Sequence, residues 1–236
     1  LVSLKSNIKY NPHAECPVFS DFLTSIFDGD DNLIGFVKRA VGYSLTGRID
    51  EQCFFIMNGD GANGKSTLLN ILIKLLGHYA KTAPEQTLLA KQSIGVGDDL
   101  DYLAGARLIT VPETDKDQAL AEAKLKRMTG GDDITGRALY GVYGSFKNIG
   151  KIVLATNNLP KVSGRDHGIF RRFQIIPFDK TFSADQQDKT LPEKLEAELS
   201  GILNWAIQGC LEWQQQGLNP PQIVRDQLDH YRSDLD

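Results

Sequence analysis

The chain contains 236 residues, of which 41% are hydrophobic and 24% are charged, and its formal net charge is −4. This composition argues against a disordered chain, and the negative charge argues against nucleic-acid binding through bulk basicity. No stretch approaches the roughly 20 apolar residues of a membrane-spanning helix, and three scattered cysteines are too few for a disulfide framework or a zinc site. We therefore expect one sizeable core, or one core with small appendages, in a reducing compartment. Because the chain begins with Leu1, we also expect it to be a piece of a longer polypeptide.

Charge is distributed unevenly along the chain. Residues 124–151 hold six basic and two acidic side chains, whereas residues 182–236 hold four basic and ten acidic ones. The basic region allows a local anion-binding surface, but charge alone does not distinguish such a surface from an ordinary solvated face.

Residues 1–49 are expected to be largely helical after an extended start. A short helix should begin at Ser20 or Asp21, and the acidic turn 28–31 separates it from a second helix.

Residues 53–76 combine a strand pattern, a glycine-rich loop and a helix pattern. Residues 53–57 form a short apolar run that suits a strand covered on both faces, and residues 66–76 are apolar nearly all round, as in a buried helix. Between them, Gly59–Ser66 reads GDGANGKS and matches the phosphate-binding P-loop in full. Strand, loop and helix together provide the context that this motif requires.

The P-loop predicts nucleoside triphosphate binding. Its backbone N–H groups face the phosphates, the helix N-terminus adds partial positive charge, Lys65 reaches the outer phosphates, and the Ser66 hydroxyl can ligate Mg²⁺. The residues expected to bind the nucleotide are Gly59, Asp60, Gly61, Ala62, Asn63, Gly64, Lys65, Ser66 and Thr67.

The rest of the chain alternates between strands and helices, which predicts an α/β fold with a mainly parallel sheet and flanking helices. The expected elements are strand 108–111, helix 116–128, a hairpin or extended loop over 137–147, strand 152–155, strand 173–178 and a long helix over 191–217.

Polar residues at the ends of these strands are candidates for catalysis. Glu113 follows strand 108–111, which we expect beside the P-loop strand, where a carboxylate would polarise the attacking water and interact with Mg²⁺. Asp115, with Gln118 three residues later, is better interpreted as the N-cap of helix 116–128. Asn157 follows strand 152–155, where an amide can hold the water or the γ-phosphate.

Arg171 and Arg172 form a pair of guanidinium groups before strand 173–178. Such a positive fork stabilises phosphoryl transfer, although taken alone it would be interpreted as a surface ion pair.

These motifs in this order resemble the superfamily 3 helicase domain of phage and plasmid primase-helicases, the family that includes the poxvirus-type proteins. The resemblance covers about residues 10–185. It rests on GYSLTG (42–47), NGDGANGKSTLLN (58–70), GARLITVPETD (105–115), LKRMTGGDDITGR (125–137), VLATNNLP (153–160) and GIFRRFQIIPF (168–178).

The resemblance implies a P-loop NTPase with an AAA+-like sheet that works as an ATP-driven, usually hexameric ring, with a primase domain upstream. It divides the chain into a helical leader (1–49), an ATPase core (50–181) and a C-terminal helical segment (182–236). It also implies the cytoplasm as the location, that of a bacterial host if the gene belongs to a phage or plasmid.

The resemblance also implies residue roles. Asn157 corresponds to the sensor residue and Glu113 to the Walker B carboxylate. Arg171 or Arg172 corresponds to the arginine that acts on the neighbouring subunit's nucleotide. Pro112 stands where many P-loop ATPases carry a first acidic residue, so Mg²⁺ would depend on Ser66, phosphates and water more than on a direct carboxylate.

By the same resemblance, the segment from Lys126 through Lys147 corresponds to the region that carries the central DNA-binding loop. Arg137 and Lys147 can contact phosphates and Tyr140 can stack on bases. The aromatic residues of this segment could equally pack the hairpin, and Lys147 could be a solvated lysine.

The predicted function is therefore that of an ATP-dependent DNA helicase domain that acts as a homo-oligomer on single-stranded or forked DNA. A DNA-bound initiator or clamp that does not unwind DNA is the main alternative. A small-molecule kinase leaves the motifs of residues 125–160 unexplained. A purely structural P-loop module leaves Glu113, Asn157 and the two arginines without a purpose.

Overall fold

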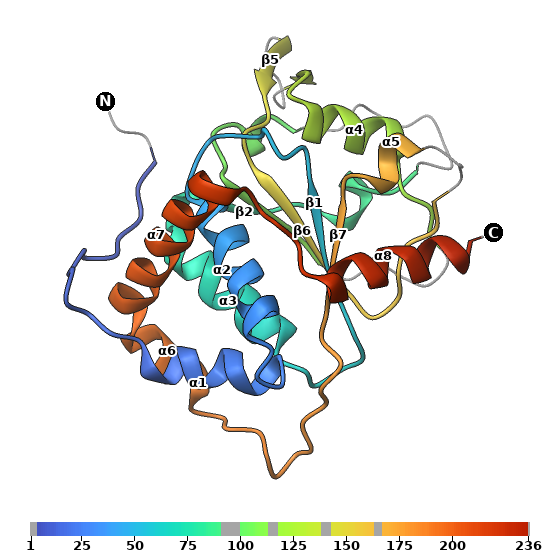
Figure 1. The fold of residues 1–236 in the computed structure, drawn as a ribbon. Coiled ribbons are helices and arrows are strands. Elements are labelled where there is room, and N and C mark those ends of the chain that lie inside the picture. The colour runs from blue at the N-terminus through green and yellow to red at the C-terminus, as the bar shows by residue number, and fades with distance from the viewer. Residues whose placement is uncertain (1–3, 91–99, 113–117, 138–142, 163–166, 236) are drawn as a thin grey trace.

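The computed structural model describes residues 4–90, 100–112, 118–137, 143–162 and 167–235. A five-stranded parallel sheet forms its centre, with strand order β2-β3-β6-β1-β7 (Figure 1). The strands are β1 (Phe54–Asn58), β2 (Ala80–Thr82), β3 (Leu108–Val111), β6 (Lys151–Thr156) and β7 (Phe173–Pro177). The predicted α/β fold with a mainly parallel sheet is confirmed.

Helices cover both faces of the sheet (Figure 1). One face carries α1 (Pro17–Ile26), α2 (Asp31–Ser44), α3 (Lys65–Leu76), α6 (Leu191–Ala197) and α7 (Leu199–Gln216). The other carries α4 (Glu122–Gly130), α5 (His167–Phe170) and α8 (Gln222–Ser233). Short 3₁₀ turns lie at η1 (Gly77–Tyr79), η2 (Glu85–Thr87) and η3 (Asp101–Leu103). No helix in the described ranges is long and apolar enough to cross a bilayer.

Strand β1 shows why the central strands are apolar throughout. Phe55 and Met57 belong to the hydrophobic cluster under α1, α2 and α3, whereas Phe54 and Ile56 belong to the cluster on the opposite face. All four side chains are almost fully buried. A parallel sheet with helices on both faces requires this pattern.

Helices from the two ends of the chain, α2 and α7, lie in one layer. Helix α2 packs along α7 so closely that a Cβ on Gly42 would lie 2.0 Å from the backbone N of Cys210, and a Cβ on Gly209 would lie 2.1 Å from the carbonyl O of Lys38. Residues 1–49 and 182–236 therefore contribute to the same core as the sheet.

The predicted helix 191–217 is wrong in one respect, because it is two helices separated at Glu198. The Glu198 carboxylate accepts hydrogen bonds from the backbone N–H groups of Val18, at 3.0 Å, and Phe19, at 2.9 Å. It thereby satisfies the N-terminus of α1, whose own N-cap residue, Cys16, makes no side-chain cap. A capping residue this distant in sequence leaves no local pattern.

The predicted helix 116–128 begins late. Ala119 pairs with Lys161 and Leu120 pairs with Leu89 in isolated β-bridges, so the helix cannot begin before Glu122. Gln118 therefore lies outside the first turn, and the capping box with Asp115 is wrong, although Asp115 itself lies outside the described residues.

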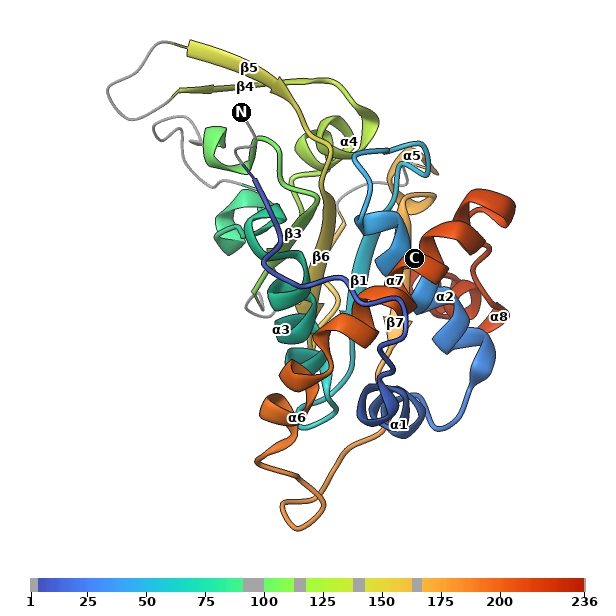
Figure 2. The same cartoon turned by 90° about the vertical axis from the view of Figure 1, so that its left-hand side faces the viewer.

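The basic region forms a hairpin. Strands β4 (Asp133–Arg137) and β5 (Tyr143–Lys147) pair antiparallel, with Ile134 opposite Phe146, and project beyond the sheet (Figure 2). Because β6 begins only four residues after Lys147, the hairpin lies at the amino end of the sheet. The expected hairpin is confirmed, with its first strand four residues earlier than predicted.

Candidate nucleotide site

The P-loop joins strand β1, which pairs with β6 and β7, to the buried helix α3. Two of its glycines adopt positive φ angles, 153° at Gly59 and 88° at Gly64, and Gly64 is the N-cap of α3. A Cβ on Gly59 would lie 2.3 Å from the carbonyl O of Phe178, and one on Gly64 would lie 2.6 Å from Cγ2 of Ile26. Only glycine satisfies both the backbone conformation and the space at these positions.

Lys65 lies at the centre of the site. The residue is only 6% exposed, and its ammonium donates hydrogen bonds to the carbonyl O of Gly59, to that of Asp60 at 3.2 Å and to the Asn157 Oδ1 at 3.0 Å. These three oxygen atoms help to hold the cation at the N-terminus of α3, where outer phosphates would lie.

Asn157 reaches the P-loop because its strand lies next to that of the P-loop. Strand β6 pairs directly with β1, with Thr156 opposite Asn58, so the residues after both strands meet at the carboxyl end of the sheet. In open α/β sheets ligands bind at this end.

Strand β3 does not lie beside the P-loop strand, so that prediction is wrong. It pairs with β2 and β6, and β6 separates it from β1. Order along the chain does not determine order in a sheet, because crossover helices can skip a strand. Glu113, which follows β3, lies outside the described residues.

The residues around Lys65 suit a magnesium–nucleotide complex. Ser66 is exposed in the first turn of α3, Thr67 is half-buried, and the loop residues Asp60, Gly61 and Ala62 are exposed. No cluster of three or more His, Cys, Asp or Glu side chains suited to a metal occurs in the part of the chain that the structure describes. Ser66 offers a hydroxyl oxygen there, and hydroxyl, phosphate and water oxygens are ligands that Mg²⁺ accepts.

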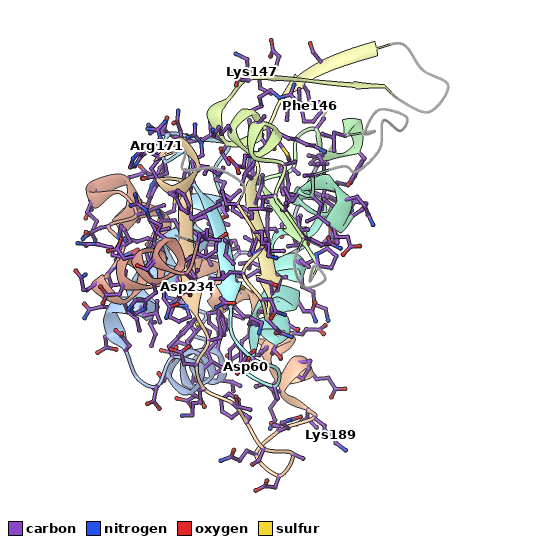
Figure 3. All side chains as sticks on the ribbon, turned by 90° about the vertical axis from the view of Figure 1, so that its right-hand side faces the viewer. Asp60, Phe146, Lys147, Arg171, Lys189 and Asp234 are labelled. Atoms are coloured by element: carbon purple, nitrogen blue, oxygen red, sulfur yellow. The ribbon has the colours of Figure 1, made fainter. Side chains whose placement is uncertain are left out.

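The two arginines lie at the opposite end of the sheet. Phe54 pairs with Phe173 and Asn58 with Pro177, so Arg171 and Arg172 precede the amino end of β7 while the P-loop follows the carboxyl end of β1. Five strand residues correspond to roughly 16 Å. Figure 3 shows Arg171 in the upper part of the molecule and Asp60 in the lower part.

The environments of the two arginines also differ. Arg171 is exposed and donates to the Gln52 Oε1 at 3.1 Å. Arg172 is 8% exposed, and its guanidinium donates to the Thr129 Oγ1 at 3.0 Å and to the carbonyl O of Gly168. Arg172 therefore holds α4 and α5 together, whereas Arg171 faces outward.

The predicted DNA-binding residues are only partly described. Lys147 is exposed near the end of the hairpin strand β5, at the same end of the molecule as Arg171 (Figure 3). Phe146 is half-buried against the core under the hairpin. Arg137 ends β4, but its side chain and the whole of Tyr140 lie outside the described residues.

Two residues at the base of the hairpin were missed by the sequence patterns. The buried Asn148 donates to the carbonyl O of Met128 at 2.8 Å and to that of Gly150 at 2.9 Å. Lys151, 2% exposed, donates to the carbonyl O groups of Thr46 and Ile149. Burial lowers the pKa of Lys151 to about 7. Lysine and asparagine side chains in a basic region suggest a solvated surface. The sequence therefore gives no signal that Asn148 and Lys151 are buried and bonded to backbone carbonyl groups.

The fold is a five-stranded parallel sheet with a P-loop after the interior strand β1, and an asparagine from the adjacent strand lies at the P-loop lysine. These features define an α/β protein of the P-loop NTPase class. Residues 57–172 match a protein-family model described as a family of unknown function (DUF5906).

Relatives by sequence are proteins of large DNA viruses. The chain is 28% identical over 226 residues to putative helicase L207/L206 of Acanthamoeba polyphaga mimivirus, covering 88% of this chain and 24% of that protein. It is 26% identical over 236 residues to putative helicase 022R of Frog virus 3, covering 91% and 24%. A 129-residue match to putative primase C962R of African swine fever virus is 28% identical, covering 53% and 13%.

The fold is similar to that of a solved C-terminal region of NrS-1, with a TM-score of 0.68 at 16% identity, covering 88% of this chain and 48% of that one. The chain spans about a quarter of the length of L207/L206 and of 022R. The resemblance to primase-helicases expected from the sequence is confirmed by these relatives.

Proposed function

We propose that this chain is the ATPase core of a DNA helicase that hydrolyses ATP between the subunits of a ring and translocates on DNA. The observation that carries the proposal is the 3.0 Å contact between the Lys65 Nζ and the Asn157 Oδ1. It joins the P-loop to the end of the adjacent strand. A hydrolase needs an amide at this place to hold the attacking water or the γ-phosphate, whereas an asparagine with a purely structural role would not need to lie beside the P-loop lysine.

Within one subunit, the proposed roles follow from the chemistry of each group. Lys65 moves from its carbonyl partners onto the outer phosphates, and Asn157 then orients the γ-phosphate or the water. Mg²⁺ held by Ser66 and the phosphates would neutralise charge on the leaving group. Glu113 is proposed as the base that activates water. In this account Lys65→Ala weakens nucleotide binding, whereas Glu113→Gln keeps binding and stops turnover.

The position of Arg171 supports catalysis across an interface. Its guanidinium is exposed at the end of the sheet opposite the P-loop, so it cannot reach the nucleotide of its own subunit. In a closed ring each subunit presents one surface to a different surface of its neighbour, so Arg171 is available to the next P-loop. Arg172 is already bonded to Thr129 and Gly168, so we assign the trans role to Arg171.

The hairpin is the proposed DNA contact. Lys147 and Arg137 lie on paired strands that project from the sheet (Figure 2). Basic side chains on a projecting ribbon can follow a phosphate backbone without reading its sequence.

Strand displacement on a forked duplex tests this function against an initiator or clamp that binds DNA without unwinding it. The proposal predicts ATP-dependent displacement, ATP hydrolysis stimulated by single-stranded DNA, and a ring-sized particle when both ligands are present. DNA-stimulated hydrolysis without displacement would favour the clamp. Hydrolysis that DNA leaves unchanged would remove the nucleic-acid role.

A further inference from the structure

Asn63 occupies a position of the P-loop that the motif leaves open. The pattern specifies the outer glycines, the lysine and the hydroxyl residue, and it accepts any residue at the four positions between the glycines. Asn63 is 3% exposed, whereas the preceding loop residues Gly61 and Ala62 are exposed. A buried amide must satisfy both its donors and its acceptor, so its partners indicate its role.

The Asn63 amide nitrogen attaches the loop to strand β7. It donates to the carbonyl O of Phe178 at 3.2 Å and to the carbonyl O of Asp60 within the loop. The residues after β7 hold the loop at a second point, because the Phe182 N–H donates to the carbonyl O of Ala62 at 2.8 Å. Gly59, which permits the close approach of Phe178, completes this attachment.

The Asn63 amide oxygen faces Lys65. It lies 3.2 Å from the Lys65 Nζ and accepts from the Lys65 backbone N–H at 3.4 Å. One side chain therefore fixes the curvature of the loop through its NH₂ group and the position of the ammonium through its oxygen. Both effects are present before any phosphate binds.

We propose that Asn63 is a positioning residue that pre-organises the P-loop for the triphosphate, by attaching it to the end of β7 and holding Lys65 beside the phosphate position. The inference rests on the proposed ATPase function. A loop that is already ordered loses less conformational entropy on binding, so the contribution of Asn63 should appear in nucleotide affinity. Once phosphates occupy the loop they hold it themselves, and turnover should depend less on Asn63.

The test compares Asn63→Ala, Asn63→Asp and the control Asn32→Ala, an exposed asparagine on α2. Calorimetry with MgATP gives Kd, steady-state hydrolysis gives KM and kcat, and circular dichroism gives Tm. We expect Asn63→Ala to raise Kd and KM by about tenfold, the loss of one to two hydrogen bonds, with kcat within about twofold. Asn32→Ala should match the wild-type chain.

Asn63→Asp separates positioning from packing, because it keeps the size of the side chain. Its carboxylate cannot donate to Phe178 and repels the triphosphate, so affinity should fall further than in Asn63→Ala. This additional loss should shrink as salt is raised, since salt screens charge repulsion. A merely structural role would lower Tm and leave Kd and KM of the folded variant at their wild-type values. If Asn63→Ala fails to fold, Asn63→Asp carries the test alone.

The inference would be overturned if Asn63→Asp kept the wild-type Kd and KM, or if a folded variant lost only kcat. In either case, ATP binding by the wild-type chain would leave the proposed function standing. Failure of the wild-type chain to bind MgATP would overturn the proposed function and this inference with it.

Discussion

Arg171 and Arg172 are adjacent in the chain, yet the Arg171 guanidinium is exposed beside Gln52 while the Arg172 guanidinium is buried on the Thr129 hydroxyl. Residues that look equivalent in the sequence therefore have separate tasks. One joins two helices to the start of β7, and the other faces outward at the end of the sheet away from the P-loop.

Single substitutions should separate these tasks. Arg172→Ala removes a buried charged donor and leaves the Thr129 hydroxyl and the Gly168 carbonyl without it, so it should lower the free energy of unfolding by about 2–3 kcal/mol. Arg171→Ala should leave that free energy within about 0.5 kcal/mol, because it removes an exposed hydrogen bond. Urea denaturation of both variants measures the difference, and equal decreases would contradict the assignment.

Lys147→Ala should weaken binding of single-stranded DNA while basal ATP hydrolysis persists, because Lys147 lies on the hairpin far from the P-loop (Figure 3). The slope of log affinity against log salt should flatten by about 0.7 for each DNA phosphate that the variant no longer neutralises. Fluorescence anisotropy with a labelled oligonucleotide at several salt concentrations measures both quantities. Lys189→Ala, an exposed lysine in the segment before α6, is the matched control. Equal slopes in the two variants would place the DNA-binding surface elsewhere.

Glu198→Ala should destabilise the chain by about 1–2 kcal/mol, because it leaves the N–H groups of Val18 and Phe19 without their carboxylate. Glu193→Ala, which removes an exposed acid in the first turn of α6, should change stability by only a few tenths of a kcal/mol. Thermal unfolding of both variants measures the loss of stability that each substitution causes. Similar Tm values would show that the cap contributes nothing.

Lys151 should make stability depend on pH. Burial holds its pKa at about 7 in the folded chain, and the value in the unfolded chain is about 10.4. The unfolded state therefore binds more protons above pH 7, and the contribution of Lys151 to stability rises with pH, by up to about 1.4 kcal/mol per unit. Burial raises the pKa of Cys53 and of Tyr43, so both stay protonated in this window.

Urea denaturation between pH 7 and 8.5 isolates this contribution when the wild-type chain is compared with Lys151→Met. The free energy of unfolding should increase more steeply with pH in the wild-type chain. Parallel pH profiles would show that Lys151 stays charged in its buried position.

The sequence predicted those features that depend on local patterns. The strand before the P-loop, the buried helix after it and the hairpin each follow from a periodicity or a motif within a short window. The sequence did not predict that β6 lies between β1 and β3, because strand order depends on packing of the whole chain.

Long-range contacts explain the other differences. Glu198 breaks a continuous helical pattern to cap a helix about 180 residues away in sequence, and the bridges at Ala119 and Leu120 delay the start of α4. At the candidate site, the P-loop was predictable from its motif. The burial of Asn63 and the different environments of the two arginines were not, since their partners are backbone and side-chain groups from distant segments.

The most direct test of catalysis between subunits is ATP hydrolysis by a mixture of Lys65→Ala and Arg171→Ala chains. Each variant alone should be inactive. Lys65→Ala lacks the P-loop cation. In Arg171→Ala each nucleotide lacks the neighbour's arginine, which contributes about 10³-fold or more to kcat. In randomly mixed rings about a quarter of the interfaces pair an intact P-loop with an intact Arg171. We predict that a corresponding part of the wild-type rate returns. A mixture that stays inactive, although mass measurement shows that mixed assemblies have formed, would contradict the account.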